Sequence, residues 1–319
     1  MNVLSVSNNM LINELTEKEY APLSIKRTFV KQKSLDSSKL LAIIDSGIDT
    51  TLFTWQIKNL IWSDKPGTPT LYNFLPRQPV SDFSDDGIIK HGSAVTALAI
   101  NAMENSQSYP RLMILKALDK DDHGTTFTVS CALSYAIQNH ATIVNASLGY
   151  LGKPDPLLEH YIRLCTIPKQ NPIQLFFAAG NTPDPHDDKQ ICSKNNNTNL
   201  LTGSTLFYPA CFSNQFANIT SVTQVRVPDT SCYYQYYSPS YISLGVLNTK
   251  FCCSFEVDFR NNNVNYYEGS SFATPIASGT KMTTIINSSN TGLTNPIWNG
   301  LVKTAPQKLV TKDGSYIIY

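Results

Sequence analysis

The sequence lacks any long apolar segment. Nowhere does an apolar run approach the roughly 18 to 20 residues that a membrane-spanning helix requires. The first 34 residues also lack a positively charged start followed by an unbroken apolar stretch and a small-residue cleavage site, so no secretory signal is expected. These absences predict a soluble protein without a membrane span, located in the cytoplasm or exported without a classical signal peptide.

Net charge is nearly absent as well. The 319 residues include 25 basic and 24 acidic side chains, which give a formal charge of +1. This balance argues against a nucleic-acid partner, because such surfaces cluster Lys and Arg against phosphates. Hydrophobic residues make up 42% and charged residues 15% of the chain, a composition typical of a globular protein with a sizeable core.

Cysteine and histidine show no metal-binding spacing. The seven cysteines are odd in number and contain no metal-ligand pairs, so reduced thiols are expected. No metal and no other cofactor are predicted. Two glycosylation sequons, at Asn145 and Asn218, lie inside apolar runs that are typical of buried strands, so neither is expected to carry a glycan.

From Leu40 onward, apolar strands alternate with helices. Asp155 and Pro156 suit the N-cap and the first position of one of these helices. Uniformly apolar strands between helices predict a parallel sheet covered on both faces. Residues 40–319 are expected to form one α/β domain, and residues 1–39 an N-terminal extension. The expected strands are 40–45, 112–118, 141–149 and 173–181, with helices at 91–103, 127–139 and 155–167. The polar stretches 192–199 and 260–269 are expected to be loops.

Three polar landmarks fall where predicted strands end. They are Asp45, the segment 147–149, and Asn181. Ligands and catalytic groups of parallel sheets collect beyond the carboxyl ends of the strands, so this edge is the expected functional site.

A serine, a histidine and an aspartate occupy motif-like positions. A serine hydroxyl becomes a nucleophile when an imidazole takes its proton and a carboxylate orients that imidazole. Asp45 ends "LLAIID", His91 opens "HGSAVTALAI", and Ser271 lies in "GSSFATP". Taken alone, the Asp45 motif is more often a turn after a strand, and the Ser271 motif is more often an ordinary helix cap.

The ordered set Asp45-Ser46-Gly47, His91-Gly92-Ser93 and Gly269-Ser270-Ser271 resembles the signatures of the subtilisin-like serine proteases, the subtilases. The resemblance covers about residues 40–285 and implies a three-layer αβα sandwich with a mostly parallel central sheet. It also implies a serine endopeptidase with Asp45, His91 and Ser271 as catalytic triad and Asn181 as oxyanion donor. The substrate-binding residues that it implies are Ser147, Leu148, Gly149, Ala179, Gly180 and Gly203.

Some family features are missing. The run from His91 to Lys116 lacks a cluster of carboxylates, so a calcium requirement is not expected. The extension is too short for the propeptide domain of secreted members, which leaves a short inhibitory or docking segment, or control by an inhibitor or regulatory partner. Asp184, Asp187 and Asp188 are expected to belong to a solvated loop, and the alternative is an acidic rim that prefers basic substrates or binds a cation.

Two other functions fit the same scaffold. A pseudoprotease would keep the cleft and bind extended peptides along Ser147 to Gly149 by strand addition. A transpeptidase or peptide cyclase would let an amine intercept the acyl-enzyme before water does. The sequence contains no feature that excludes amine attack.

Overall fold

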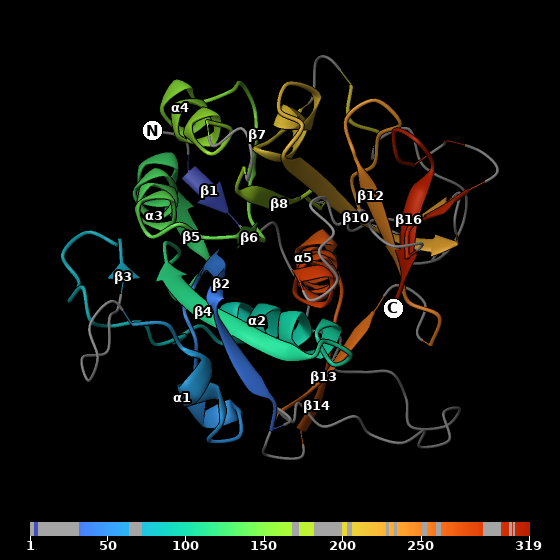
Figure 1. Cartoon of the computed structure of the whole chain (residues 1–319). Helices are drawn as coiled ribbons and strands as arrows, with labels where there is room; N and C mark the ends of the chain where they lie inside the picture. The colour runs from blue at the N-terminus through green and yellow to red at the C-terminus, as the bar shows by residue number, and fades with distance from the viewer. Residues whose placement is uncertain are drawn as a thin grey trace.

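A largely parallel sheet runs through the chain (Figure 1). This computed structural model describes residues 3–5, 32–63, 72–167, 172–181, 200–202, 206–227, 230–232, 235–250, 254–259, 263–289, 301–305, 308 and 310–319. Within these residues, eight strands pair in parallel in the order β3 (Tyr72–Asn73), β4 (Ser108–Lys116), β2 (Ser34–Asp45), β6 (Ile143–Ala146), β8 (Gln174–Ala178), β10 (Ile219–Val227), β12 (Leu244–Leu247) and β16 (Ser315–Ile318). Two short strands, β11 (Thr230–Ser231) and β15 (Lys303–Thr304), join this sheet antiparallel to β10 and β16.

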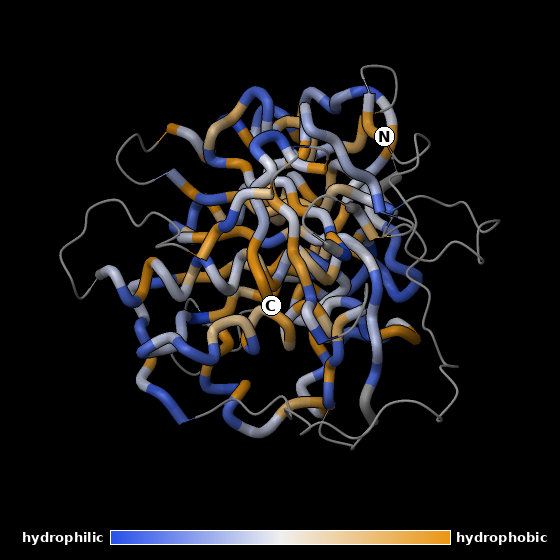
Figure 2. The backbone as a smooth tube through the Cα atoms, turned by 90° about the vertical axis from the view of Figure 1, so that its right-hand side faces the viewer, coloured by the Kyte–Doolittle hydropathy of each residue, from blue (hydrophilic) through white to orange (hydrophobic). Residues whose placement is uncertain are grey.

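Two long helices, α2 (His91–Ala102) and α5 (Ser270–Ser289), pack together on one face of the sheet, and α3 (Thr126–Gln138) and α4 (Pro156–Leu164) on the other. Strand β2 shows why both faces need cover. Leu41 and Ile43 pack in the cluster that contains α2 and α5, whereas Ala42 and Ile44 pack in the cluster that contains α3. Successive side chains of a strand point to opposite faces, so an unbroken apolar strand requires a helical layer on each side. In Figure 2, hydrophobic stretches of the backbone accordingly gather in the interior of the molecule. The predicted three-layer αβα arrangement is confirmed.

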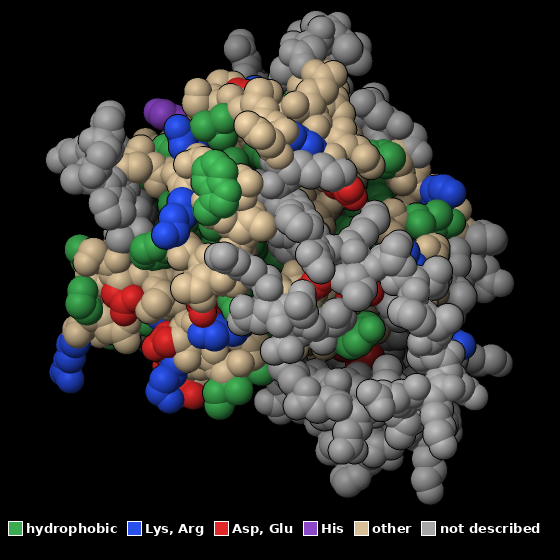
Figure 3. All heavy atoms as spheres, turned by 90° about the horizontal axis from the view of Figure 1, so that it is seen from below, with side chains coloured by type: hydrophobic (Ala, Val, Ile, Leu, Met, Phe, Trp, Pro, Cys, Tyr) green, Lys and Arg blue, Asp and Glu red, His purple; other side chains and the backbone are tan. Residues whose placement is uncertain are grey.

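Short elements surround this frame. The pairs β1 (Val3–Ser5) with β5 (His123–Thr125), β7 (Tyr150–Leu151) with β9 (Phe207–Tyr208), and β13 (Phe255–Phe259) with β14 (Asn263–Tyr267) are antiparallel. One-turn segments occur at η1 (Thr50–Leu52), α1 (Ile57–Leu60) and η3 (Ala210–Asn214). Charged side chains of both signs are interspersed over the described part of the face in Figure 3. No helix within the described ranges has the length and apolar character to cross a membrane.

Most predicted elements occur close to their expected positions. Asp155 caps α4 by accepting hydrogen bonds from the backbone N–H groups of Leu157 and Leu158, with Pro156 at the first helical position. Both sequon asparagines, Asn145 and Asn218, are buried. The boundary expected at residue 40 falls inside β2, whose first residues, from Ser34, already pair with β4.

Two predictions are wrong. The described part of the segment expected as a polar loop, residues 263–269, contains β14, which pairs with the apolar strand β13; its partner strand rather than its own composition determines its conformation. Cys232 is in a disulfide bond, so the expectation of reduced thiols fails there, whereas Cys131, Cys165 and Cys211 are free thiols. The expected loop at 192–199 lies outside the described residues.

Candidate active site

Asp45 and His91 form a buried pair at the carboxyl edge of the sheet. Asp45 is the last residue of β2 and His91 the first of α2. The Nδ1 atom of His91 lies 2.7 Å from Oδ1 of Asp45, and both side chains are almost fully buried. The backbone N–H of Ser46 also donates to Oδ1 of Asp45, at 2.8 Å. The carboxylate therefore holds the imidazole by its Nδ1 edge and leaves Nε2 as the ring nitrogen available for chemistry.

Glycine at two motif positions lets β2 and α2 approach closely enough for this pair. A Cβ on Gly92 would lie 2.3 Å from the carbonyl oxygen of Gly47, and Gly47 itself adopts φ +108°. A side chain at either position would push the start of α2 away from the end of β2. The glycines that follow Asp45-Ser46 and His91 are thus explained by backbone contact.

Asp85 holds the same two segments together from the loop before α2. Its Oδ2 accepts hydrogen bonds from the backbone N–H and the hydroxyl of Ser93, at 2.8 and 2.6 Å. Its Oδ1 accepts from the hydroxyl of Ser46 at 3.2 Å, and that hydroxyl accepts from the backbone N–H of Gly92 at 3.0 Å. Burial raises the pKa of Asp85, and its hydrogen bonds with Ser93 oppose the rise. The neighbours of both Asp45 and His91 are therefore fixed by one buried carboxylate.

Ser271 is the second residue of α5, which begins at Ser270. Its hydroxyl donates to the carbonyl oxygen of Ser147 at 3.0 Å, just beyond the end of β6. One further buried contact joins α5 to β6, because the hydroxyl of Ser278 donates to Oδ1 of Asn145. Nδ2 of Asn145 in turn donates to the hydroxyl of Ser147. The first turn of α5 is therefore anchored against the end of β6.

The imidazole and the Ser271 hydroxyl are not hydrogen-bonded to each other. Nε2 of His91 is buried and has no hydrogen-bond partner within the described part of the chain. The residue after Ser271, Phe272, packs on the imidazole with ring centroids 5.1 Å apart. The structure thus brings α5 against His91 and holds the hydroxyl toward Ser147 instead of toward Nε2.

Asn181 follows β8 and faces the start of α5. Its Oδ1 accepts from the backbone N–H and the hydroxyl of Ser270, at 3.0 and 3.1 Å. The hydroxyl of Ser270 also accepts from the backbone N–H of Gly180 at 2.9 Å. These bonds fix the acceptor end of the Asn181 amide and so determine where its donor end points.

The remaining predicted substrate residues border this site. Ser147 and Leu148 follow β6 and are buried, as is Ala179 after β8. Gly149 and Gly180 both contact the ring of Phe207, where a Cβ would lie 2.2 and 2.7 Å from ring atoms. Gly203, Asp184, Asp187 and Asp188 lie outside the described residues.

A segment of the N-terminal extension lies along this edge. β1 pairs antiparallel with β5, with Ser5 opposite His123 and Val3 opposite Thr125, and β1 also lies close to β7. An extended stretch of the chain therefore occupies the space between β5 and the segment that follows Ser147 to Gly149.

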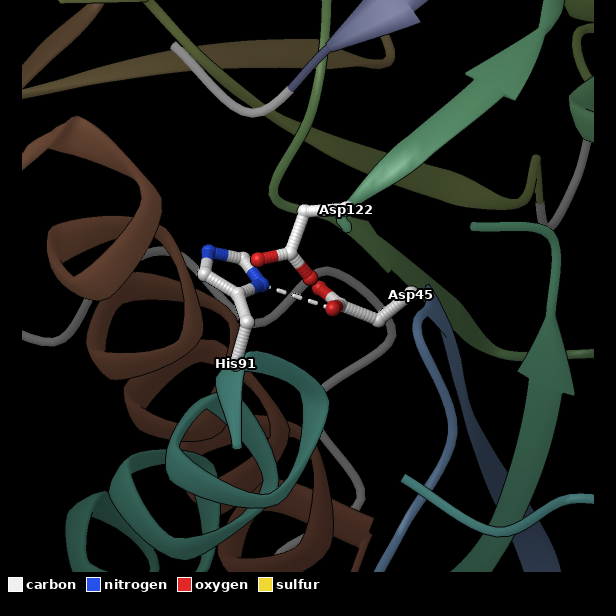
Figure 4. A group of neighbouring side chains, drawn as sticks. All are labelled: Asp45, His91 and Asp122. Carbon is white, nitrogen blue, oxygen red and sulfur yellow. Dashed lines mark hydrogen bonds and ion pairs between the residues drawn. The ribbon is translucent and has the colours of Figure 1, made fainter. Parts of the chain in front are cut away.

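The environment of His91 is strongly anionic. Burial alone lowers the pKa of His91, but the charge of Asp45 and its hydrogen bond outweigh this, with smaller effects from Asp122 and Asp85, and raise the pKa to about 9. Asp122 lies beside the pair (Figure 4), and burial raises its pKa to about 6. Sequence reasoning missed both Asp85 and Asp122. The feature of the sequence that could have identified them is their position next to segments at the carboxyl edge of the sheet.

Comparisons with known proteins found a matching family model and solved structures of similar fold. The sequence model of the subtilase family matches residues 36–312. No curated protein matches the chain. Among solved structures, the prenylagaramide maturation protease PagA is similar with a TM-score of 0.57 and 20% identity, over 88% of each chain. The protease domain of PatA is similar with a TM-score of 0.56 and 18% identity, over 91% of this chain and 94% of that one.

Proposed function

We propose, from the premise that this chain belongs to the subtilase family, that it is a serine endopeptidase acting through Asp45, His91 and Ser271. The observation that carries the proposal is the buried 2.7 Å contact between Nδ1 of His91 and Asp45. It presents Nε2 on the side where α5 begins, and that is the geometry needed for a base that activates a serine.

In the proposed reaction, His91 acts first as base and then as acid. The Ser271 hydroxyl turns from the Ser147 carbonyl to Nε2, gives up its proton and attacks the carbonyl carbon of a peptide bond. The imidazolium, held by Asp45, then protonates the leaving amine, and an acyl-enzyme remains on Ser271. Water, activated by the same imidazole, releases the acyl group and regenerates the hydroxyl.

The oxyanion would be stabilised by Asn181 and the start of α5. With Oδ1 of Asn181 accepting from Ser270, we assign Nδ2 as one donor and the backbone N–H of Ser271 as the other. The positive end of the α5 dipole favours the same charge. We expect Asn181→Ala to lower kcat by about 100-fold to 1000-fold with a small change in KM, measured on a peptide substrate.

Labelling by a fluorophosphonate tests the proposal, because this reagent reacts with an activated serine. We expect rapid labelling of the wild type, none of Ser271→Ala, and labelling of the control Ser240→Ala, which removes an exposed hydroxyl. We expect the proteins that are labelled to cleave denatured casein and Ser271→Ala not to cleave it. Mass spectrometry of the products should show hydrolysed rather than ligated peptides. A folded wild type that is neither labelled nor active would disprove the proposal.

One observation favours a second candidate function, peptide binding without cleavage. The Ser271 hydroxyl is bonded to Ser147 and Nε2 of His91 has no partner within the described residues, an arrangement that a non-catalytic protein would also tolerate. Binding of extended peptides with equal affinity by the wild type and Ser271→Ala, together with absence of labelling, would support this alternative.

The N-terminal extension is proposed as an inhibitory segment. Its strand β1 pairs with an edge of β5. From the resemblance to the family, we expect the substrate backbone to bind along the neighbouring segment Ser147 to Gly149. A peptide substrate adding a strand at this edge would compete with β1.

A further inference from the structure

Asp122 is a second carboxylate beside the His91 imidazole, contributed by the turn between β4 and β5. It precedes β5 by one residue and adopts φ +58°, in the left-handed region that non-glycine residues seldom occupy. Ligand atoms of Asp45, His91 and Asp122 all lie within 4.8 Å of one another. Figure 4 shows the Asp122 carboxylate directed at the imidazole from a different element than Asp45.

Fold stability does not account for a carboxylate at this position. Asp122 is only 8% exposed, and its Oδ1 is buried with no hydrogen-bond partner in the described ranges. The hydroxyl of Ser46 is a neutral partner, and no ion pair between Asp122 and Lys or Arg occurs among the described residues. A buried carboxylate without a cation destabilises a protein. Among the described residues close to Asp122, protonated His91 is the group that can offset this charge.

We propose that Asp122 is a positioning residue that acts through His91, as a second carboxylate that stabilises the imidazolium formed when His91 accepts the Ser271 proton. This inference rests on the proposed protease function. Asp45 holds the Nδ1 edge of the ring, and Asp122 adds negative charge from the turn before β5. The ring is thereby kept oriented and made more basic by two anions on separate elements.

The other groups around His91 leave this role to Asp122. Asp85, from the loop before α2, uses both oxygens for Ser46 and Ser93. Tyr267 on β14 donates its hydroxyl to the Ile89 carbonyl, and Phe272 on α5 is uncharged. Lys90 pairs with Asp49 and donates to the Asp85 carbonyl, and Lys116 pairs with Asp86. Of the described carboxylates around His91, Asp45 and Asp122 therefore each keep one buried oxygen without a hydrogen-bond partner.

Removing the charge of Asp122 should change the pH profile in a defined direction. Ionised Asp122 favours the imidazolium, so Asp122→Asn should shift the acid limb of the kcat/KM profile to lower pH by about one pH unit. The same loss should lower kcat on the alkaline plateau by about threefold to tenfold, because the imidazolium in the transition state is less stabilised. A residue with a purely structural role would lower activity without moving the limb.

The experiment compares Asp122→Asn with Asp121→Asn, the exposed neighbour in the same turn, using a peptide without ionisable side chains. A shifted limb in Asp122→Asn alone supports the proposal, and an unshifted limb, or equal shifts in the two variants, overturns it. Asp122→Ser replaces Asp122→Asn if the latter does not fold.

A second measurement does not depend on catalysis. NMR titration of the His91 imidazole is carried out in Ser271→Ala and in Ser271→Ala with Asp122→Asn. A lower imidazole pKa in the double variant supports the proposal and an unchanged pKa overturns it. Because neither protein needs to be active, failure of the protease proposal, shown by the fluorophosphonate, stays separate from failure of this one.

Discussion

At the scale of single residues, Asp85 is the group whose loss should spread furthest through the site. Its two oxygens bind Ser46 and Ser93, the residues next to Asp45 and two after His91. Asp85→Asn keeps the shape but places an N–H₂ group against donors, so we expect a loss of about 1–3 kcal/mol in unfolding free energy and a lower kcat. Urea unfolding and peptide hydrolysis measure these, with Asp121→Asn as control. Unchanged stability would show that Asp85 does not join the two segments.

The protonation of His91 should make stability fall as pH rises. Its pKa in the folded protein is about 9, against an ordinary value of 6.5. Folding therefore favours the protonated ring, and this contribution is present in full below about pH 6.5 and lost as pH rises through about 9. We expect the stability difference between Ser271→Ala and the same protein with His91→Gln to shrink between pH 6 and 9.5, in urea unfolding. A difference that grows over this range would contradict the raised pKa.

The sequence identifies some residues of the site and not others. Asp45, His91 and Ser271 each stand in a recognisable motif at the end or start of an element, which makes them visible without a structure. Asp85 and Asp122 lie in loops with other aspartates, Asp86 and Asp121, whose side chains are half-exposed or exposed. Which aspartate of Asp85 and Asp86, or of Asp121 and Asp122, is buried depends on how its loop packs against α2 or β5. The sequence alone does not determine this packing.

At the scale of elements, strands that are apolar throughout were predictable from the sequence. Strands that form only because a neighbouring strand pairs with them were not. Residues 40–45 of β2, together with β6 and β8, are buried on both faces, so their composition alone indicates strands. β14, "NVNYY", is rich in asparagine and becomes a strand because β13 supplies its hydrogen-bond partners. Propensity in a strand reflects packing on neighbours, and a sequence does not display those neighbours.

The contact between α2 and α5 should link stability to catalysis. A Cβ on Gly279 of α5 would lie 2.4 Å from the carbonyl oxygen of Ala99 on α2. Since α2 carries His91 and α5 carries Ser271, Gly279→Ala should separate the two helices, cost about 1–3 kcal/mol and lower kcat.

Thermal unfolding and peptide hydrolysis would measure both effects of Gly279→Ala. The control is Asn287→Ala on the same helix, where the lost contact is an exposed hydrogen bond with the backbone of Gln107. If Gly279→Ala is destabilised but fully active, the helix contact does not position the site.

At the scale of the whole molecule, the extension and the peptide-binding edge should compete. Any substrate that pairs with β5 must first displace β1, so the fraction of molecules with a free edge limits the apparent affinity. Deleting residues 1–31 should therefore raise kcat/KM on extended peptides by at least about threefold, mainly through a lower KM. Steady-state kinetics of the two forms measure this.

A synthetic peptide of residues 1–12 tests whether the deleted segment inhibits when it is supplied separately. Added to the shortened protein, it should inhibit competitively, because it restores the strand at β5 without a covalent link, whereas a peptide of the same composition in scrambled order should not. The linked segment acts at a high effective concentration, so the free peptide is expected to be needed at about millimolar levels. If the shortened protein keeps the KM of the full chain, the β1 segment does not limit access to the site, and regulation must be sought in a separate partner.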